Sequence, residues 1–204
     1  MILGSHNTMT YLKPRKWWMW LGRFMAKCQS RPIKQQYDKG ARWFDLRISY
    51  IEKDTLLHPV FSHGMMNFKG DIEPVLMFLN SKDNVYCRFV LEKGNKNVKQ
   101  LFICHVALWM ARFPNLKVTQ IVKKGEWENL IEPNATMPLP GKDAYASSNG
   151  YYPKYQNLPG FLKNKTISGL LIDDLWPWIY AKFNNKKNLK KYKDDDIVLL
   201  IDFI

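Results

Sequence analysis

The chain has 204 residues, of which 46% are hydrophobic and 14% aromatic, enough for a real core. The length suits one domain, over residues 1–204. No apolar run reaches the roughly eighteen residues that a membrane-spanning helix needs, so we expect no transmembrane helix. A net charge of +13, if evenly spread, attracts a polyanion, either nucleic acid or an anionic membrane surface.

The cysteines carry no recognisable framework. Cys28, Cys87 and Cys104 stand in apolar stretches, and their odd number and wide spacing fit neither a disulfide scaffold nor a zinc site. We therefore expect reduced, mostly buried thiols. The first motif begins so close to Met1 that it leaves no room for a signal peptide, although a leader removed earlier would leave no trace. Localisation accordingly stays open between cytoplasm and secretion.

Three predicted strands near the N-terminus each end in a chemically reactive side chain. The apolar pair at residues 2–3 stops at a polar stretch that contains His6, and a short strand at 58–61 leads to His63. Between these two segments in the sequence, residues 42–48 alternate with period two. This places Asp45 and Arg47 on one face of a third strand. In a βα barrel, the ends of the strands meet at one rim, where catalytic residues sit.

The segment 11–30 combines tryptophans with basic residues. Its aromatic and apolar side chains nearly encircle the helix that we expect to follow Pro14. A core helix would explain some of them, but three tryptophans within four positions cannot all point inward. We therefore expect that at least one of Trp17, Trp18 and Trp20 contacts a membrane interface.

The remaining elements follow from periodicity and turn signals. We predict helices over 71–79, 98–112 and 176–185, and strands over 85–91, 116–122, 167–172 and 197–204. His105 lies within the apolar stripe of the second of these helices, so we expect it in the core. Residues 123–165 show no clear pattern, and their tyrosines (Tyr145, Tyr151, Tyr152 and Tyr155) could contact a ligand. The basic run 186–193 is interpreted as a solvated helix end.

The ordered motifs resemble one known family. GSHN (4–7), GARWFDLR (40–47) and HG (63–64) appear in the order found in the X-type catalytic domain of phosphatidylinositol-specific phospholipase C, in its bacterial, metal-independent branch. The last strand carries Asp202 at the position that matches a histidine-supporting aspartate. The resemblance implies a TIM-type (β/α) barrel of the phospholipase C-like phosphodiesterase kind. Because about 250 residues are typical of such barrels, we expect a small, irregular or truncated one.

The resemblance also implies roles for individual residues. His6 would act as the general base on the inositol 2-hydroxyl, and His63 as the general acid toward diacylglycerol. Arg47 would contact the phosphate, Asp45 would hold Arg47, and Asp202 would support His6. The first product would be a cyclic inositol phosphodiester. Asn7, Glu92 and Lys93 are candidate contacts for the lipid headgroup, although Glu92 and Lys93 fit a solvated turn equally well.

Metal dependence turns on Arg47. Calcium-dependent members of the family carry an acidic ligand at that position, so the guanidinium predicts no metal and no cofactor. Asn7 and Glu92 match positions of the calcium-dependent members, however, and with Asp45 they could form a weak oxygen site. We expect a monomer that acts on a phosphoinositide, or on another anionic headgroup, at a membrane surface.

Three other functions remain as alternatives. A related barrel phosphodiesterase, specific for a glycerophosphodiester or a sphingolipid, would normally hold a divalent ion through an E-x-D pair, where this chain has Asp45-Leu46-Arg47. A nucleic-acid-binding module would fit the charge, but the sequence contains no helix-turn-helix, zinc or RNP-like pattern. We therefore expect that the protein does not bind nucleic acid. An inactive lipid-binding barrel would not need both histidines.

Overall fold

The computed structural model describes residues 1–126, 128–136, 145–147, 177–194 and 197–204. The strands are β1 (Ile2–Ser5), β2 (Trp43–Lys53), β3 (Leu56–His63), β4 (Met66–Asn67), β5 (Tyr86–Leu91), β6 (Lys117–Lys123), β7 (Tyr145–Ser147) and β8 (Val198–Ile201). The helices are α1 (Arg23–Ala26), α2 (Ile33–Asp38), α3 (Ile72–Asn80), α4 (Lys96–Arg112) and α6 (Pro177–Lys191), with 3-10 turns η1 (Thr8–Tyr11) and η2 (Trp17–Trp20).

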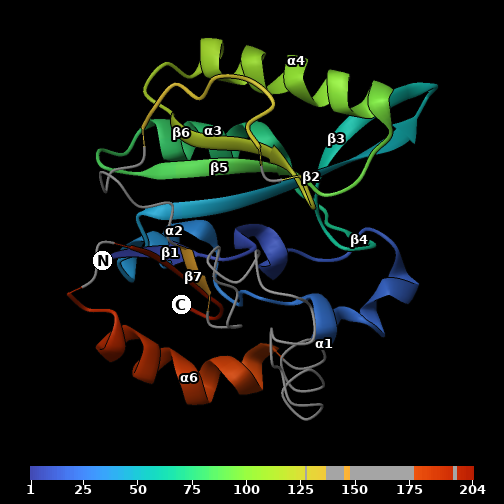
Figure 1. Ribbon diagram of the computed structural model, residues 1–204. Helices are drawn as coiled ribbons and strands as arrows, with labels where there is room; N and C mark the ends of the chain where they lie inside the picture. Colours follow the sequence, from blue (N-terminus) through green and yellow to red (C-terminus); the bar gives the residue numbers. More distant parts are fainter. Residues whose placement is uncertain (127, 137–144, 148–176, 195–196) are drawn as a thin grey trace.

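Six parallel strands form the body of the sheet, in the order β6-β5-β2-β1-β8-β7. The sheet curls into a half-barrel, with α4 above it and α6 below it in Figure 1. Within the described residues, β6 pairs only with β5 and β7 only with β8. The truncated barrel expected from the sequence is thus consistent with the structure, whereas a closed ring of eight strands is not formed by these residues.

The third strand differs from the expectation, because it does not run parallel to its neighbours. β2 continues to Lys53, a turn of two residues reverses the chain, and β3 returns antiparallel to it. Asp54 and Thr55 both have positive φ, 49° and 65°, as a type I′ hairpin turn requires. The polar connection predicted over 51–57 is therefore the tip of a hairpin, and His63 reaches the site at the end of its returning arm.

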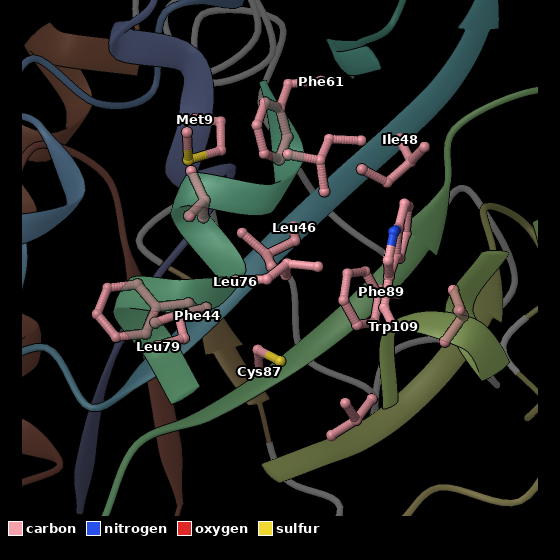
Figure 2. Close-up of a cluster of buried hydrophobic side chains, with 14 of the residues drawn as sticks. Met9, Phe44, Leu46, Ile48, Phe61, Leu76, Leu79, Cys87, Phe89 and Trp109 are labelled. Carbon is pink, nitrogen blue, oxygen red and sulfur yellow. The ribbon is translucent and has the colours of Figure 1, made fainter. Parts of the chain in front are cut away.

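The main hydrophobic core lies on the outer face of the sheet, against α3 and α4 (Figure 2). Alternation along β2 sends Phe44, Leu46 and Ile48 into this core, while Asp45 and Arg47 face the inside of the half-barrel. Helix α4 covers Phe89 of β5 with Trp109, whose ring lies 5.5 Å from the Phe89 ring between centroids. Both faces of β2 are buried, so the polar inner face needs internal ion pairs.

The connection between β1 and β2 contains only short turns. The helix expected to follow Pro14 is replaced by η2 and α1, each of four residues. Pro14 pairs with Phe68 in an isolated bridge, and Gly22 separates η2 from α1, so no continuous helix forms. The expected strand over 167–172, and Tyr151, Tyr152 and Tyr155, lie outside the described residues, as does the side chain of Tyr145. None of the described helices is both long and apolar enough to span a bilayer.

Candidate active site

The edges of β1 and β8 bring His6 and Asp202 together. The two strands pair in parallel with Gly4 opposite Leu200, and a Cβ on Gly4 would lie only 2.5 Å from Cδ2 of Leu200. Glycine therefore permits the close approach of these strands. One pleat beyond their ends, Nδ1 of His6 lies 2.8 Å from Oδ1 of the fully buried Asp202. In neutral His6 this leaves Nε2 as the free base.

Arg47 lies at the centre of the site and contacts three groups. Its Nε donates to Oδ2 of Asp45 (3.0 Å), and its Nη1 donates to Oε2 of Glu92 (3.3 Å). Its Nη2 lies 3.1 Å from Nε2 of His6. The fork is thus held by two buried carboxylates with one nitrogen directed at the base of the pair, which leaves further N–H groups of the guanidinium for a phosphate.

Two more cations complete the ion-pair network. Nε of Arg88, on β5, donates to Oδ1 of Asp45 at 2.7 Å. Nζ of Lys124, just after β6, donates to Oε1 of Glu92 at 2.5 Å. Each buried carboxylate is therefore shared by two cations, and this compensates the cost of removing the charges from water.

His63 is held by backbone. Its Nδ1 lies 2.9 Å from the carbonyl oxygen of Ala26, the last residue of α1. A carbonyl only accepts, so Nδ1 carries the proton and Nε2 faces the site as an acceptor. Gly64, with φ of +58°, donates its N–H to Oε1 of Glu92 at 2.7 Å. A left-handed glycine at this turn thereby anchors the end of β3 to the network around Arg47.

Asn7 lies between the two histidines. Its Nδ2 is 3.3 Å from Nε2 of His6 and 3.3 Å from Nε2 of His63. The residue adopts a left-handed backbone, with φ of 45°, and its N–H donates to Oδ2 of Asp45 at 3.0 Å. Its Oδ1 is buried without a hydrogen-bond partner among the described residues. A buried acceptor of this kind is well suited to a hydroxyl group of a substrate.

Burial and neighbouring charges shift the pKa values of the site residues in different directions. Burial alone would raise the pKa of Asp45 and Glu92, but Arg47 and the other cations hold both pKa values below their ordinary ranges. Burial would likewise lower the pKa of Arg47, yet Asp45 and Glu92 hold it above its usual value. Burial, followed by the charge of Arg47, lowers the pKa of His63 to about 4. In the protein alone His63 is therefore neutral at pH 7.

Among the described residues, one cluster has the spacing of a metal site. The candidate ligand atoms of His6, Cys28 and Asp202 all lie within 4.8 Å of one another. Burial, and then the charge of Asp202, raises the pKa of Cys28, so its sulfur is held as a thiol instead of the thiolate that binds metals. Nδ1 of His6 is already used by Asp202. The donor set therefore fits a metal ion poorly.

The structure brings together most of the residues singled out from the sequence. Lys93 is exposed, and no contact joins it to the site within the described residues. Lys124 lies at Glu92 instead. Arg88 and Lys124 were not predicted, although the reasoning that identified Asp45 and Glu92 could have found them: Arg88 shares a face of β5 with Glu92, and Lys124 follows the end of β6. All three cysteines are free, and Cys28 and Cys87 are buried as expected, whereas Cys104 is exposed. Cys28 lies 3.3 Å from Nδ2 of Asn7, a contact that its position in the sequence does not indicate.

No family model matches the chain, and no curated protein matches it in sequence. In structure it is similar to the phosphatidylinositol-specific phospholipase C from Listeria monocytogenes, with a TM-score of 0.57 and 17% sequence identity. The alignment covers 99% of this chain and 87% of that chain. At this identity the likeness shows the fold alone. The chain therefore shares the fold of that protein, in the form of a half-barrel.

Proposed function

We propose that the protein is a phosphodiesterase that cleaves a phosphoinositide or a related phosphodiester with two histidines as general base and general acid. The observation that carries the proposal is the convergence on one point of Nε2 of His6, Nη2 of Arg47 and, through Asn7, Nε2 of His63. A base, a fixed cation and a second imidazole within a few ångströms of one another suit phosphoryl transfer. The phospholipase C-like fold supports the same reading.

The chemistry follows from the hydrogen bonds. Nε2 of His6 takes the proton of an attacking hydroxyl while that oxygen forms a bond to phosphorus, and Asp202 stabilises the resulting imidazolium through Nδ1. Arg47 stabilises the charge that develops on the phosphoryl oxygens. Nε2 of His63 gives its proton to the leaving oxygen as the second phosphorus–oxygen bond breaks. With an inositol lipid, attack by the 2-hydroxyl yields a cyclic inositol phosphate and diacylglycerol.

His63 must be protonated to act as the acid, and its lowered pKa makes that dependent on the substrate. The anionic phosphodiester offsets the positive charge of Arg47, which is one of the two main causes of the low pKa. Binding of the substrate therefore raises the pKa of His63 and loads the acid. Asn7 assists by offering the unpaired Oδ1 to a substrate hydroxyl.

We propose that this reaction needs no metal ion. The oxygens that would form a calcium site, those of Asp45 and Glu92, already receive hydrogen bonds from Arg47, Arg88 and Lys124. A divalent ion at that point would meet the fixed charge of Arg47 at close range. The same hydrogen bonds argue against the alternative function, a related phosphodiesterase that holds a divalent ion between two acidic residues.

The proposed partner is a membrane surface, reached by the segment between β1 and β2. Trp17, Trp18 and Trp20 are 81%, 51% and 47% exposed, while Met19 between them is buried. Aromatic rings favour the headgroup zone of a bilayer. Replacement of Trp17 by Ala should weaken binding to lipid vesicles and leave the cleavage of a water-soluble inositol phosphodiester nearly unchanged. Equal losses on both substrates would assign Trp17 a structural role instead.

Product analysis on phosphatidylinositol, with and without EDTA, tests the proposal. We expect diacylglycerol and a cyclic inositol phosphate in both conditions, and no appreciable gain from calcium. Activity that chelation abolishes would contradict the metal-free mechanism. Cleavage of a glycerophosphodiester or a sphingolipid, with phosphatidylinositol left intact, would keep the reaction class but reassign the substrate.

A further inference from the structure

The positive charge of the chain is concentrated in two segments. The first 37 residues contain seven Lys or Arg and no Asp or Glu, and residues 177–193 contain six Lys and again no acidic residue. These thirteen cations equal the whole net charge of +13, because the rest of the chain has eighteen basic and eighteen acidic residues. The even distribution assumed from composition is therefore wrong.

The two segments are neighbours in space, although they lie far apart in the sequence. Helix α6 contacts α1, and the orange N-terminal end of α6 lies nearest to α1 in Figure 1. All the lysines of α6 and Lys193 just after it are exposed. Lys182, Lys186 and Lys190 recur every fourth residue, so they form one stripe along the helix. In the sequence, the acidic run 194–196 comes after the C-terminal end of α6, whereas α1 lies nearest to its N-terminal end.

Exposed apolar side chains gather in the same two segments. Among the described residues, seven of the twelve large apolar side chains that are exposed belong to them: Trp17, Trp18, Trp20, Leu21, Phe24, Met25 and Trp178. Lys16 and Arg23 lie against the tryptophan rings, 5.7 Å and 4.6 Å from the centroids of Trp18 and Trp20. A nucleic-acid duplex is bound mainly through its phosphates and would require only the cations. Apolar side chains interleaved with cations match the interface of an anionic bilayer.

Both segments also contact the site. The carbonyl of Ala26, at the end of α1, holds Nδ1 of His63. On α6, Nδ2 of Asn185 donates to the backbone oxygen of Asp202 at 2.6 Å, and Asp202 supports His6. The end of α1 therefore contacts His63 directly, whereas α6 is linked to His6 by two hydrogen bonds, through Asp202.

We infer that α6 is a second membrane-docking element, which supplies the electrostatic part of the attraction to anionic lipid while residues 17–25 supply the apolar part. The occupant of this surface is a bilayer that carries anionic headgroups. The inference extends the membrane contact proposed above to a helix whose basic run, 186–193, the sequence indicated only as a solvated helix end. It does not depend on the chemistry of the site, because binding is measured without turnover.

The test compares two triple variants with the same change of charge. Lys182→Gln, Lys186→Gln and Lys190→Gln remove the stripe on α6. Lys39→Gln, Lys53→Gln and Lys96→Gln remove three exposed lysines elsewhere. Each protein is sedimented with vesicles of phosphatidylcholine, with and without phosphatidylserine, at low and high salt. Thermal unfolding and cleavage of a water-soluble inositol phosphodiester verify the fold of each variant.

We expect the α6 variant to lose affinity for the phosphatidylserine vesicles by about fivefold per lysine, and thus up to roughly a hundredfold in total. The control should change much less, and high salt should remove the difference between the two. Equal binding by the α6 variant and the control would overturn the inference. So would a selective loss of duplex DNA binding by the α6 variant while vesicle binding is unchanged. If vesicle binding behaves as expected but no phosphodiester is cleaved, only the proposed reaction fails.

Discussion

The surroundings of His6 and of His63 are built in opposite ways. His6 has a buried carboxylate, Asp202, behind it, and this stabilises the protonated ring. His63 has uncharged groups in the same place, the carbonyl oxygen of Ala26 at 2.9 Å and the sulfur of Cys28 at 4.0 Å from Nδ1. Burial and the charge of Arg47 then lower the pKa of His63 to about 4. The difference shows that the partner of Nδ1 determines the role of each imidazole. A carboxylate favours the uptake of a proton by His6, and an uncharged partner favours the release of a proton by His63.

Removal of either ring should have the largest effect. We expect His6→Ala and His63→Ala each to lower turnover by roughly 10²–10⁴-fold, the usual contribution of a general acid or base. Both side chains lie at the edge of the site, outside the main hydrophobic core, so the fold should persist. Steady-state kinetics on phosphatidylinositol, with circular dichroism as the control for folding, measure the effect. More than about a tenth of the activity in either variant would refute the two-histidine mechanism.

Removal of the support behind His6 should have a smaller effect. Asp202→Asn keeps the shape of the side chain but loses the charge that stabilises the imidazolium of His6, so turnover should fall by on the order of a hundredfold or more. The titration of His63 should stay as it is in the wild type. An unchanged turnover would mean that Asp202 has a structural role. No side-chain substitution can remove the support of His63 in the same way, because that support is a backbone carbonyl.

The smallest expected effect is a shift in the pKa of His63, and it is the sharpest test of the difference between His63 and His6. In the free protein, NMR should show that His63 is protonated below about pH 4 and neutral above it, because its pKa is lowered. Arg47→Gln removes one main cause, so the pKa should rise toward 6.5, the ordinary value for histidine. Arg47→Lys keeps the charge and should leave the pKa low. Asp45 and Glu92 retain Arg88 and Lys124 as partners in both variants. A His63 that titrates near 6.5 in the wild type would contradict the assigned environment.

The periodicity of apolar residues correctly predicted most of the described strands and the long helix α4. Alternation located β2, the stripe of apolar residues located α4, and short apolar runs located β1, β5, β6 and β8. The hairpin between β2 and β3 escaped prediction because Thr55 occupies the second central position of its turn, with positive φ, where a type I′ turn usually has Gly. The tryptophan segment was predicted as a helix, but it forms two short turns, which Gly22 separates.

The site was predictable where it follows strand ends and unpredictable where it depends on distant parts of the chain. Asp45, Arg47 and Glu92 followed from position on a strand, and a wider use of that rule would have added Arg88 and Lys124. The approach of Cys28 to Asn7, and of Ala26 to His63, depends on the path of an irregular connection. No periodicity encodes such a path.

The pairing of His6 with Asp202 also constrains when the site can form. The two residues are 196 positions apart in the sequence. Gln29 fastens the same junction, since its side chain donates to the carbonyl oxygens of His6 and Ile201. A chain emerging from the ribosome presents its N-terminal part first, at about 5–20 residues per second. His6 must therefore wait for the docking of β8, and contacts of such long range form late. Translation itself thus holds the base apart from its carboxylate until the last strand has been made.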